Sequence, residues 1–216
     1  MKKVYLDVKI YFMKMKENIE IYVNDKKIKF DFKYRINESK ELKELKVKFK
    51  FRKLLSYTSY MFRGCSSLKS IDLSSFNTAN VNDMSFMFSC CSSLKSIDLS
   101  SFNTINVNNI SGMFSDCFNI NSINLSSFNT TIVNDMSYMF CGCSSLKSID
   151  LSSFNTINVN NMSYMFGRCY SIKSINLSLF NTINVNNMNY MLNECSSLNK
   201  KNIKINNKND KILNKF

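Results

Sequence analysis

Six cysteines recur at intervals of 26 residues, and their thiols are the side chains in this sequence best suited to chemistry. They are Cys65, Cys91, Cys117, Cys143, Cys169 and Cys195. Thiols in such a series could bind zinc, form disulfides or fill a buried column. Zinc sites usually use close pairs of Cys or His, but the chain has no His, and its close Cys pairs lie two repeats apart. The spacing therefore disfavours a metal site, and we expect no cofactor.

The neighbours of these cysteines favour a structural role. Cys91, for example, lies between Phe88 and Leu94, and the other five have similar apolar company. A free cysteine in such surroundings behaves as a small buried hydrophobe. The sequence therefore predicts a buried column, although disulfides between stacked units remain geometrically conceivable. Cys90 and Cys141 lie outside this column, so we predict that they are accessible thiols.

The apolar residues around the cysteines repeat with the same period, from about Leu42 to Leu198. One apolar column contains Leu68, Leu94, Ile120, Leu146, Ile172 and Leu198, and another contains Phe76, Phe102, Phe128, Phe154 and Phe180. Such self-similarity indicates a stack of identical structural units, each of which buries its apolar face against its neighbours.

Two local patterns predict the elements of each unit. Ile71 and Leu73 alternate with polar residues, which is typical of a short strand with one buried face. The residues Val81, Met84, Met87, Phe88 and Cys91 follow at helical spacing. Asn and Asp side chains just before this second segment are suited to capping a helix. We therefore predict a strand, a turn, a short helix and a return in every unit.

The repeated motif resembles that of a known family. Met-Phe-x-x-Cys-Ser-Ser-Leu-Lys-Ser-Ile-Asp-Leu-Ser-Ser-Phe-Asn-Thr is similar to the repeat of BspA-like leucine-rich-repeat surface proteins, over roughly residues 42–198. This resemblance implies a leucine-rich-repeat-like solenoid of α/β coils, with one short parallel strand and one short helix per unit. It also implies a binding or adhesion module whose partner lies on a concave strand face. The family offers no catalytic residues to carry over.

The chain divides into three parts. Residues 1–41 predict a basic, β-rich N-terminal cap, because apolar and polar residues alternate around Val4–Phe12, Ile19–Val23 and Ile28–Phe32. Residues 42–198 form about six coils, and the Leu45 and Val47 run is predicted as a strand of the first coil. Residues 199–216 form a basic C-terminal cap or tail, in which the repeat decays.

The net charge of +13 lies almost entirely in the two ends. Residues 1–56 carry 17 Lys or Arg and 8 Asp or Glu, residues 57–198 carry 6 and 7, and residues 199–216 carry 6 and 1. A nucleic-acid-binding repeat protein would be expected to spread basic residues along one face of its coils. We therefore predict no nucleic-acid partner and at most a weak attraction of the basic ends to acidic surfaces.

The N-terminal residues and the hydropathy of the chain give an expectation for its cellular location. Met1-Lys2-Lys3 resembles the charged start of a secretion signal, but Asp7 and Lys9 interrupt the apolar run that follows. The sequence therefore predicts neither a signal peptide nor a membrane span. On that ground we expect an intracellular protein, whereas the family resemblance implies the cell surface.

Outward-facing strand residues are the candidate partner-binding site, because polar residues alternate with the buried strand residues. The candidate residues are Lys69, Ser70, Asp72, Ser74, Lys95, Ser96, Asp98, Ser100, Lys147, Ser148, Asp150, Lys173, Ser174 and Asn176. They form a flat surface without aromatic or Arg anchors, which dominate binding hot spots. A merely solvated surface, in a structural or filler protein with no dedicated ligand, therefore stays open as the alternative.

A second polar column is predicted to be structural. It contains Asn77, Asn103, Asn129, Asn155 and Asn181, whose side chains can satisfy turn N–H and carbonyl groups. Catalysis has no candidate, because the chain lacks His and a Gly-rich phosphate loop, and its carboxylates follow the repeat. We therefore expect a non-enzymatic protein that binds another protein.

Overall fold

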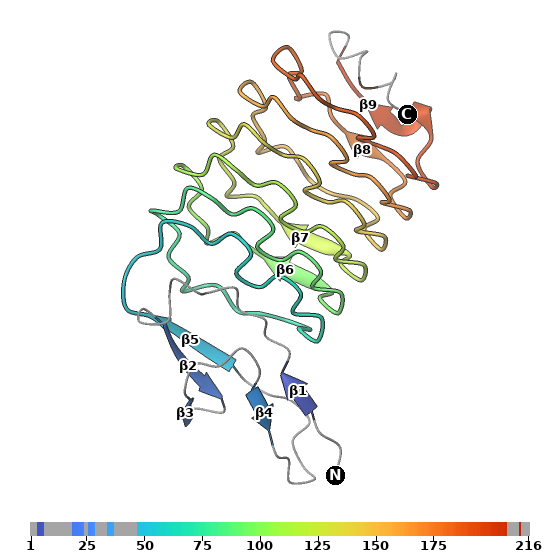
Figure 1. Ribbon diagram of the computed structural model, residues 1–216. Coiled ribbons are helices and arrows are strands. Elements are labelled where there is room, and N and C mark those ends of the chain that lie inside the picture. The colour runs from blue at the N-terminus through green and yellow to red at the C-terminus, as the bar shows by residue number, and fades with distance from the viewer. Residues whose placement is uncertain are drawn as a thin grey trace.

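The computed structural model describes residues 4–6, 19–23, 26–28, 34–36, 47–206 and 212. Within them, successive 26-residue units lie one above another as a stack of coils (Figure 1). Strands β6 (Ser96–Asp98) and β7 (Ser122–Asn124) lie side by side in this stack. At its C-terminal end lie β8 (Ile175–Asn176), the 3₁₀ turn η2 (Lys200–Asn202) and β9 (Ile203–Lys204). The chain therefore has a repeat fold with short strands.

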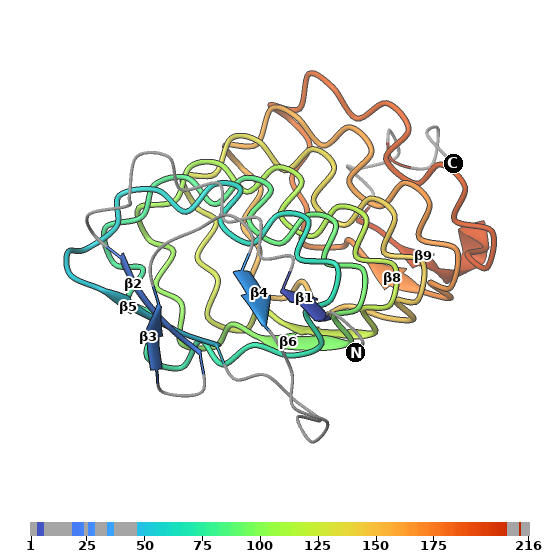
Figure 2. The same cartoon turned by 60° about the horizontal axis from the view of Figure 1, so that its bottom comes forward.

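The strands before the stack form two small antiparallel sheets, which Figure 2 brings forward. Strand β2 (Ile19–Val23) pairs with β3 (Lys26–Ile28) on one side and with β5 (Val47–Phe51) on the other. Strand β1 (Val4–Leu6) pairs with β4 (Tyr34–Ile36). Strands β2 and β3 follow each other in the chain and pair antiparallel, so they form a hairpin.

Part of the predicted N-terminal pattern cannot be compared with the structure, and part differs from it. Residues 7–12, 30, 32 and 45 lie outside the described residues. Val47 lies in a strand, as predicted, but that strand runs antiparallel to β2 rather than stacking on a coil. The alternation of Val47, Phe49 and Phe51 in the sequence fits either pairing, because it defines one apolar face and does not specify the neighbouring strand.

Charged side chains connect the three strands of the larger N-terminal sheet. Glu20 accepts hydrogen bonds from Lys27 Nζ at 2.8 Å, from Arg52 at 2.7 Å and from the Tyr22 hydroxyl at 2.9 Å. These donors, led by Lys27, hold the pKa of Glu20 at about 2. The carboxylate therefore stays ionised between two cations.

The helix predicted in each unit is wrong: the described residues contain no α-helix. Between Met84 and Cys90, alternate N–H groups donate to carbonyl groups of the next coil, ending with Cys90 to Ser115 at 2.7 Å. Of the N–H groups between them, those of Met87 and Ser89 bond three residues back, Met87 to Met84 at 3.2 Å, and that of Ser85 bonds Asp83 Oδ1 at 2.8 Å. An α-helix would direct every one of these N–H groups four residues back, so bonding between coils excludes it. We call this stretch of each coil the turn segment.

The turn segments use two backbone positions per unit with positive φ. One position holds Tyr138 and Tyr164 at φ 57 and 54, and the other holds Gly142 and Arg168 at φ 74 and 60. Each is the third residue of a four-residue turn, where type II geometry favours glycine. A larger residue there costs about 1–2 kcal/mol. The hydrogen bonds to the neighbouring coils fix this geometry.

Stacked apolar columns fill the interior of the coils. Phe88, Phe114, Phe140 and Phe166 are fully buried, and successive rings lie 5.3–5.9 Å apart with nearly parallel planes. Val81, Met84 and Met87 and their counterparts in the middle coils are also fully buried. The core is therefore continuous from coil to coil, as the repeat predicted, and each unit depends on its neighbours.

Candidate functional site

The predicted strand face is exposed, but the strand predicted in every unit forms in only some of them: β6, β7 and β8 lie at the predicted positions, whereas residues 69–73 and 147–151 form no strand. In β6 the side chains of Ser96 and Asp98 are exposed while Ile97 is buried, and Asp98 lies opposite Asn124 of β7. All fourteen predicted binding residues lie within the described part of the chain, and all are exposed. The structure thus places them on one surface, which we call the strand face.

Each Asp or Asn of the strand face also has a local structural partner. Asp72 Oδ1 accepts hydrogen bonds from the Ser74 N–H at 3.0 Å and the Ser74 hydroxyl at 2.7 Å. Asp98 and Asp150 likewise accept from the N–H two residues on, at 3.0 and 2.9 Å. The backbone donor is the main cause that lowers the pKa of all three carboxyl groups. The acidic residues therefore fix the turn after each strand and stay ionised at neutral pH.

The Asn and Thr columns tie neighbouring coils together. Asn129 Oδ1 accepts from the Thr131 N–H at 3.0 Å, and its counterparts do the same in the other coils. Thr130 is buried, and its hydroxyl donates to the Asn155 carbonyl and accepts from the Asn155 N–H. The Asn side chains thus make the turn hydrogen bonds that the sequence predicted.

The six cysteines of the column are buried, and five of them also donate a hydrogen bond. Cys117 Sγ donates to the Phe88 carbonyl in the preceding coil at 3.1 Å, and Cys143 Sγ donates to the Phe114 carbonyl at 3.2 Å. Burial raises the pKa of Cys117 to about 12 and that of Cys195 to about 11. All eight cysteines of the chain are free thiols. The column therefore holds buried free thiols, five of which hydrogen-bond to the preceding coil.

The two cysteines outside the column differ from each other. Cys90 is half-buried, in agreement with the prediction of an accessible thiol. The prediction is wrong for Cys141, whose exposed fraction is 2%. Its sulfur lies 3.7 Å from the Arg168 guanidinium, and a Cβ added to Gly167 would lie 3.5 Å from it. The next coil thus covers this thiol.

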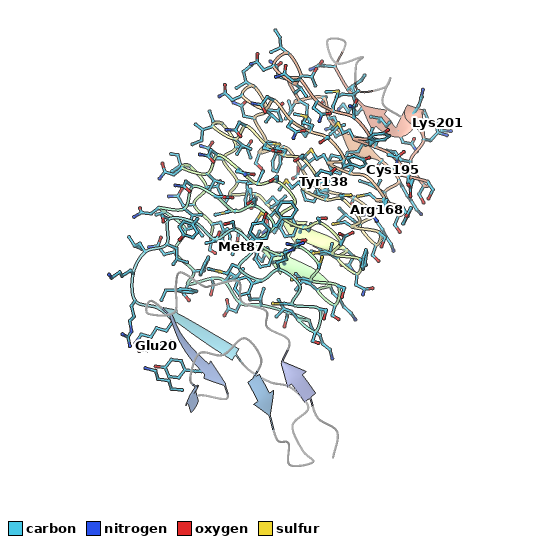
Figure 3. All side chains as sticks on the ribbon, viewed as in Figure 1. Glu20, Met87, Tyr138, Arg168, Cys195 and Lys201 are labelled. Atoms are coloured by element: carbon cyan, nitrogen blue, oxygen red, sulfur yellow. The ribbon has the colours of Figure 1, made fainter. Side chains whose placement is uncertain are left out.

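A surface that the sequence analysis did not single out lies on the turn segments of the C-terminal coils. Tyr138, Tyr164 and Tyr190 stack with ring centroids 4.9 and 4.8 Å apart, and Tyr138 and Tyr190 are 39% and 54% exposed. Phe118 and Tyr170, also exposed, follow in the adjoining turns. Figure 3 shows Tyr138 and Arg168 on the central and C-terminal coils. Together with Asp116 and Glu194 we call these residues the turn face.

An ion pair spans two coils within the turn face. Arg168 contacts Asp116 Oδ1 at 3.1 Å, although a whole coil lies between them. That coil carries Gly142 at the equivalent position, where a Cβ would lie 2.5 Å from Asp116 Oδ1. The absence of a side chain at Gly142 therefore makes room for the pair. The Tyr170 hydroxyl donates to Glu194 Oε2 at 3.1 Å beside it.

The signal for the turn face was present in the sequence. Tyr138, Tyr164 and Tyr190 occupy the third position of Met-Ser-x-Met-Phe or its variant Met-Asn-x-Met-Leu, where the other units have Tyr60, Phe86 and Gly112. The predicted helix identifies only the buried residues of this segment, whereas positive φ in the observed turn directs the third motif position outward. The Asp116, Gly142 and Arg168 substitutions are breaks in the repeat, and only the stacking of coils brings them together.

Comparison with protein families identifies the repeat. A family model described as "Mycoplasma protein of unknown function, DUF285" matches residues 31–123 and 113–216. The chain belongs to the DUF285 family. Searches of curated proteins and of solved structures gave no match.

Two further observations concern ions and membranes. In the described part of this DUF285 protein, no group of three or more His, Cys, Asp or Glu side chains could share a metal ion. Within those same residues, no helix has both the length and the apolar character needed to cross a bilayer.

Thiol modification of this DUF285 protein should separate Cys90 from the other cysteines. A thiol reagent attacks the thiolate, so buried thiols with raised pKa react slowly. We expect one of the eight cysteines to react rapidly in the native protein at pH 8, and all eight in denaturant. The Cys90→Ser variant should lose the rapid phase, and Cys141→Ser should keep it. Rapid reaction of two or more thiols in the native protein would contradict this assignment.

Proposed function

We propose that this chain is a BspA-like leucine-rich-repeat solenoid and a non-enzymatic module that binds another protein. The exposed turn face supports the proposal, because tyrosine and arginine are enriched among residues that dominate binding energy at interfaces. The turn face offers Tyr138, Tyr164, Tyr190 and Arg168 in one region. Backbone hydrogen bonds from Tyr138, Tyr164 and Arg168 to the next coil hold these three residues in place before binding, which lowers the entropy lost on association.

The strand face is the other candidate surface, as the sequence predicted. Its residues are small or charged, and Ser, Asp and Lys are depleted in typical interfaces. Each Asp already serves the turn that follows it. For a partner protein we therefore place the principal contact on the turn face.

Capture of a partner by immobilised variants tests this proposal. Tyr138→Asn, Tyr164→Asn and Tyr190→Asn together remove the rings, and Asn tolerates positive φ, so the turns are preserved. We expect this triple variant to bind a captured partner at least about 30-fold more weakly, as the loss of a hot spot would. Asp72→Lys, Asp98→Lys and Asp150→Lys together alter the strand face and should leave capture unchanged.

Other outcomes of the capture experiment would change the assignment of the binding surface. Loss of capture by the Asp variant alone would assign the partner to the strand face. The third outcome is that the parent and both variants fold equally well but none captures a partner reproducibly and in a salt-resistant way. The chain would then be a structural or filler solenoid.

A further inference from the structure

We propose that the strand face binds a second copy of this chain, across a two-fold axis that runs parallel to the stack of coils. The observation behind it is the pattern of charge on the strand face. The inference is independent of the partner surface proposed on the turn face, and either can fail alone.

Two charged rows border the strand face. One row holds Lys69, Lys95 and Lys147, and the other holds Asp72, Asp98 and Asp150, three residues later in the same units. The unit that has Asn121 instead of Lys also has Asn124 instead of Asp. Lys173, which is followed by Asn176, is the exception. In the other units Lys and Asp occur together, and the unit with Asn121 and Asn124 lacks both charges.

Hydrogen bonds between coils align these rows. The Asn121 N–H donates to the Lys95 carbonyl at 2.9 Å, and the Lys173 N–H donates to the Lys147 carbonyl at 3.3 Å. On the Asp side, Asp98 pairs with Asn124 in the parallel ladder, and the Asn124 amide donates to Asp98 Oδ1 at 2.8 Å. Lys95 immediately precedes β6 and Asp98 ends it, so three extended residues separate the two rows by about 10 Å there. Between them lie exposed serines such as Ser70, Ser96 and Ser148, which project little.

The symmetry of this pattern selects one arrangement of two copies. A two-fold axis along the stack exchanges the two rows and keeps the order of the units, as an isologous interface requires. The lysine row of each copy then faces the aspartate row of the other, so that Lys69, Lys95 and Lys147 lie opposite Asp72, Asp98 and Asp150. The neutral unit with Asn121 and Asn124 faces its counterpart in the other copy. An axis across the stack would instead place Lys opposite Lys. The strand face is therefore self-complementary in the parallel arrangement only.

The expected association is weak and salt-sensitive. An exposed ion pair contributes roughly 0–1 kcal/mol, and three pairs, each formed twice, act together here. Screening shortens the reach of exposed charges from about 10 Å at 0.1 M salt to about 3 Å at 1 M. We expect sedimentation velocity of the full chain to show concentration-dependent dimers at low salt and monomers at 1 M salt.

A charge swap tests the arrangement. Lys69→Asp, Lys95→Asp and Lys147→Asp together give an all-acidic face, and Asp72→Lys, Asp98→Lys and Asp150→Lys together give an all-basic face. Each variant alone should associate at least about tenfold more weakly than the parent, because like charges oppose each other. An equimolar mixture of the two should recover association.

A neutral variant distinguishes the loss of dimerisation from misfolding of the chain. The all-basic variant loses the acceptors for Ser74, Ser100 and Ser152, whereas Asp72→Asn, Asp98→Asn and Asp150→Asn keep an Oδ1 acceptor, as Asn124 already does. This triple Asn variant should fold as the parent does and dimerise less. A parent that is monomeric at low salt and high concentration would overturn the proposal. So would undiminished dimerisation of the triple Asn variant, or dimers that persist at 1 M salt.

Discussion

Phe140→Ala should lower the free energy of unfolding by about 3–5 kcal/mol, the range for removal of a large buried aromatic side chain. Phe140 is fully buried in the middle of the stack. Its ring lies 5.9 Å from Phe114 and 5.3 Å from Phe166, so its removal leaves a cavity and breaks two stacked contacts. Because the apolar core of each coil packs on the adjacent coils, the substitution weakens the coupling between the two halves of the stack.

Urea unfolding followed by circular dichroism measures this effect. The change should appear as a lower midpoint, and weaker coupling between the halves should also broaden the transition. Phe118→Ala is the matched control, because Phe118 is 46% exposed in the preceding coil. We expect that control to cost less than about 1 kcal/mol. Equal losses in the two variants would contradict the position of Phe140 in a continuous core.

Thr130→Val should cost about 1–3 kcal/mol, because it leaves backbone groups of the next coil without a partner. The Thr130 hydroxyl donates to the Asn155 carbonyl at 2.9 Å and accepts from the Asn155 N–H at 2.8 Å. Valine has nearly the same shape, so packing is preserved while both hydrogen bonds are lost. Thr130 is buried but Asn155 is exposed, so water can replace some of the hydrogen bonding that Asn155 loses.

Thr131→Val provides the control for this substitution. Thr131 is exposed; its backbone N–H donates to Asn129 Oδ1, and its carbonyl accepts from the Asn158 amide. The same chemical change there should alter the free energy of unfolding by less than about 0.5 kcal/mol. If the two Val variants unfold at the same urea concentration, the Thr column does not hold the coils together in the way described.

The buried side of the fold could be predicted from the sequence, because burial follows from periodicity. The columns of Phe88, Cys91 and Leu94 repeat every 26 residues, and the structure buries every member in the middle coils. The Asn77 column was likewise predicted to satisfy turn backbone, and each described Asn accepts the N–H two residues on. Both inferences needed only the repeat and the local chemistry of each residue type.

The conformation of the turn segment could not be predicted in the same way. Val81, Met84, Met87, Phe88 and Cys91 have helical spacing, and successive four-residue turns bury the same positions. The turn face was missed for the same reason, since a helix gives no cause for Tyr138, Tyr164 and Tyr190 to stack outward. Accessibility of Cys141 was also predicted wrongly, because the covering residues Gly167 and Arg168 belong to the next coil.

The sequence by itself determined the period of 26 residues, the buried columns and the polar columns that border them. Only the tertiary structure decided how each coil runs between those columns and which side chains of different coils meet. The physical reason is the range of the hydrogen bonds. The N–H groups of Met84, Phe86, Phe88 and Cys90 each bond a carbonyl 25 residues further on. Local periodicity records which residues are buried, but not whether their backbone bonds within a coil or to the next one.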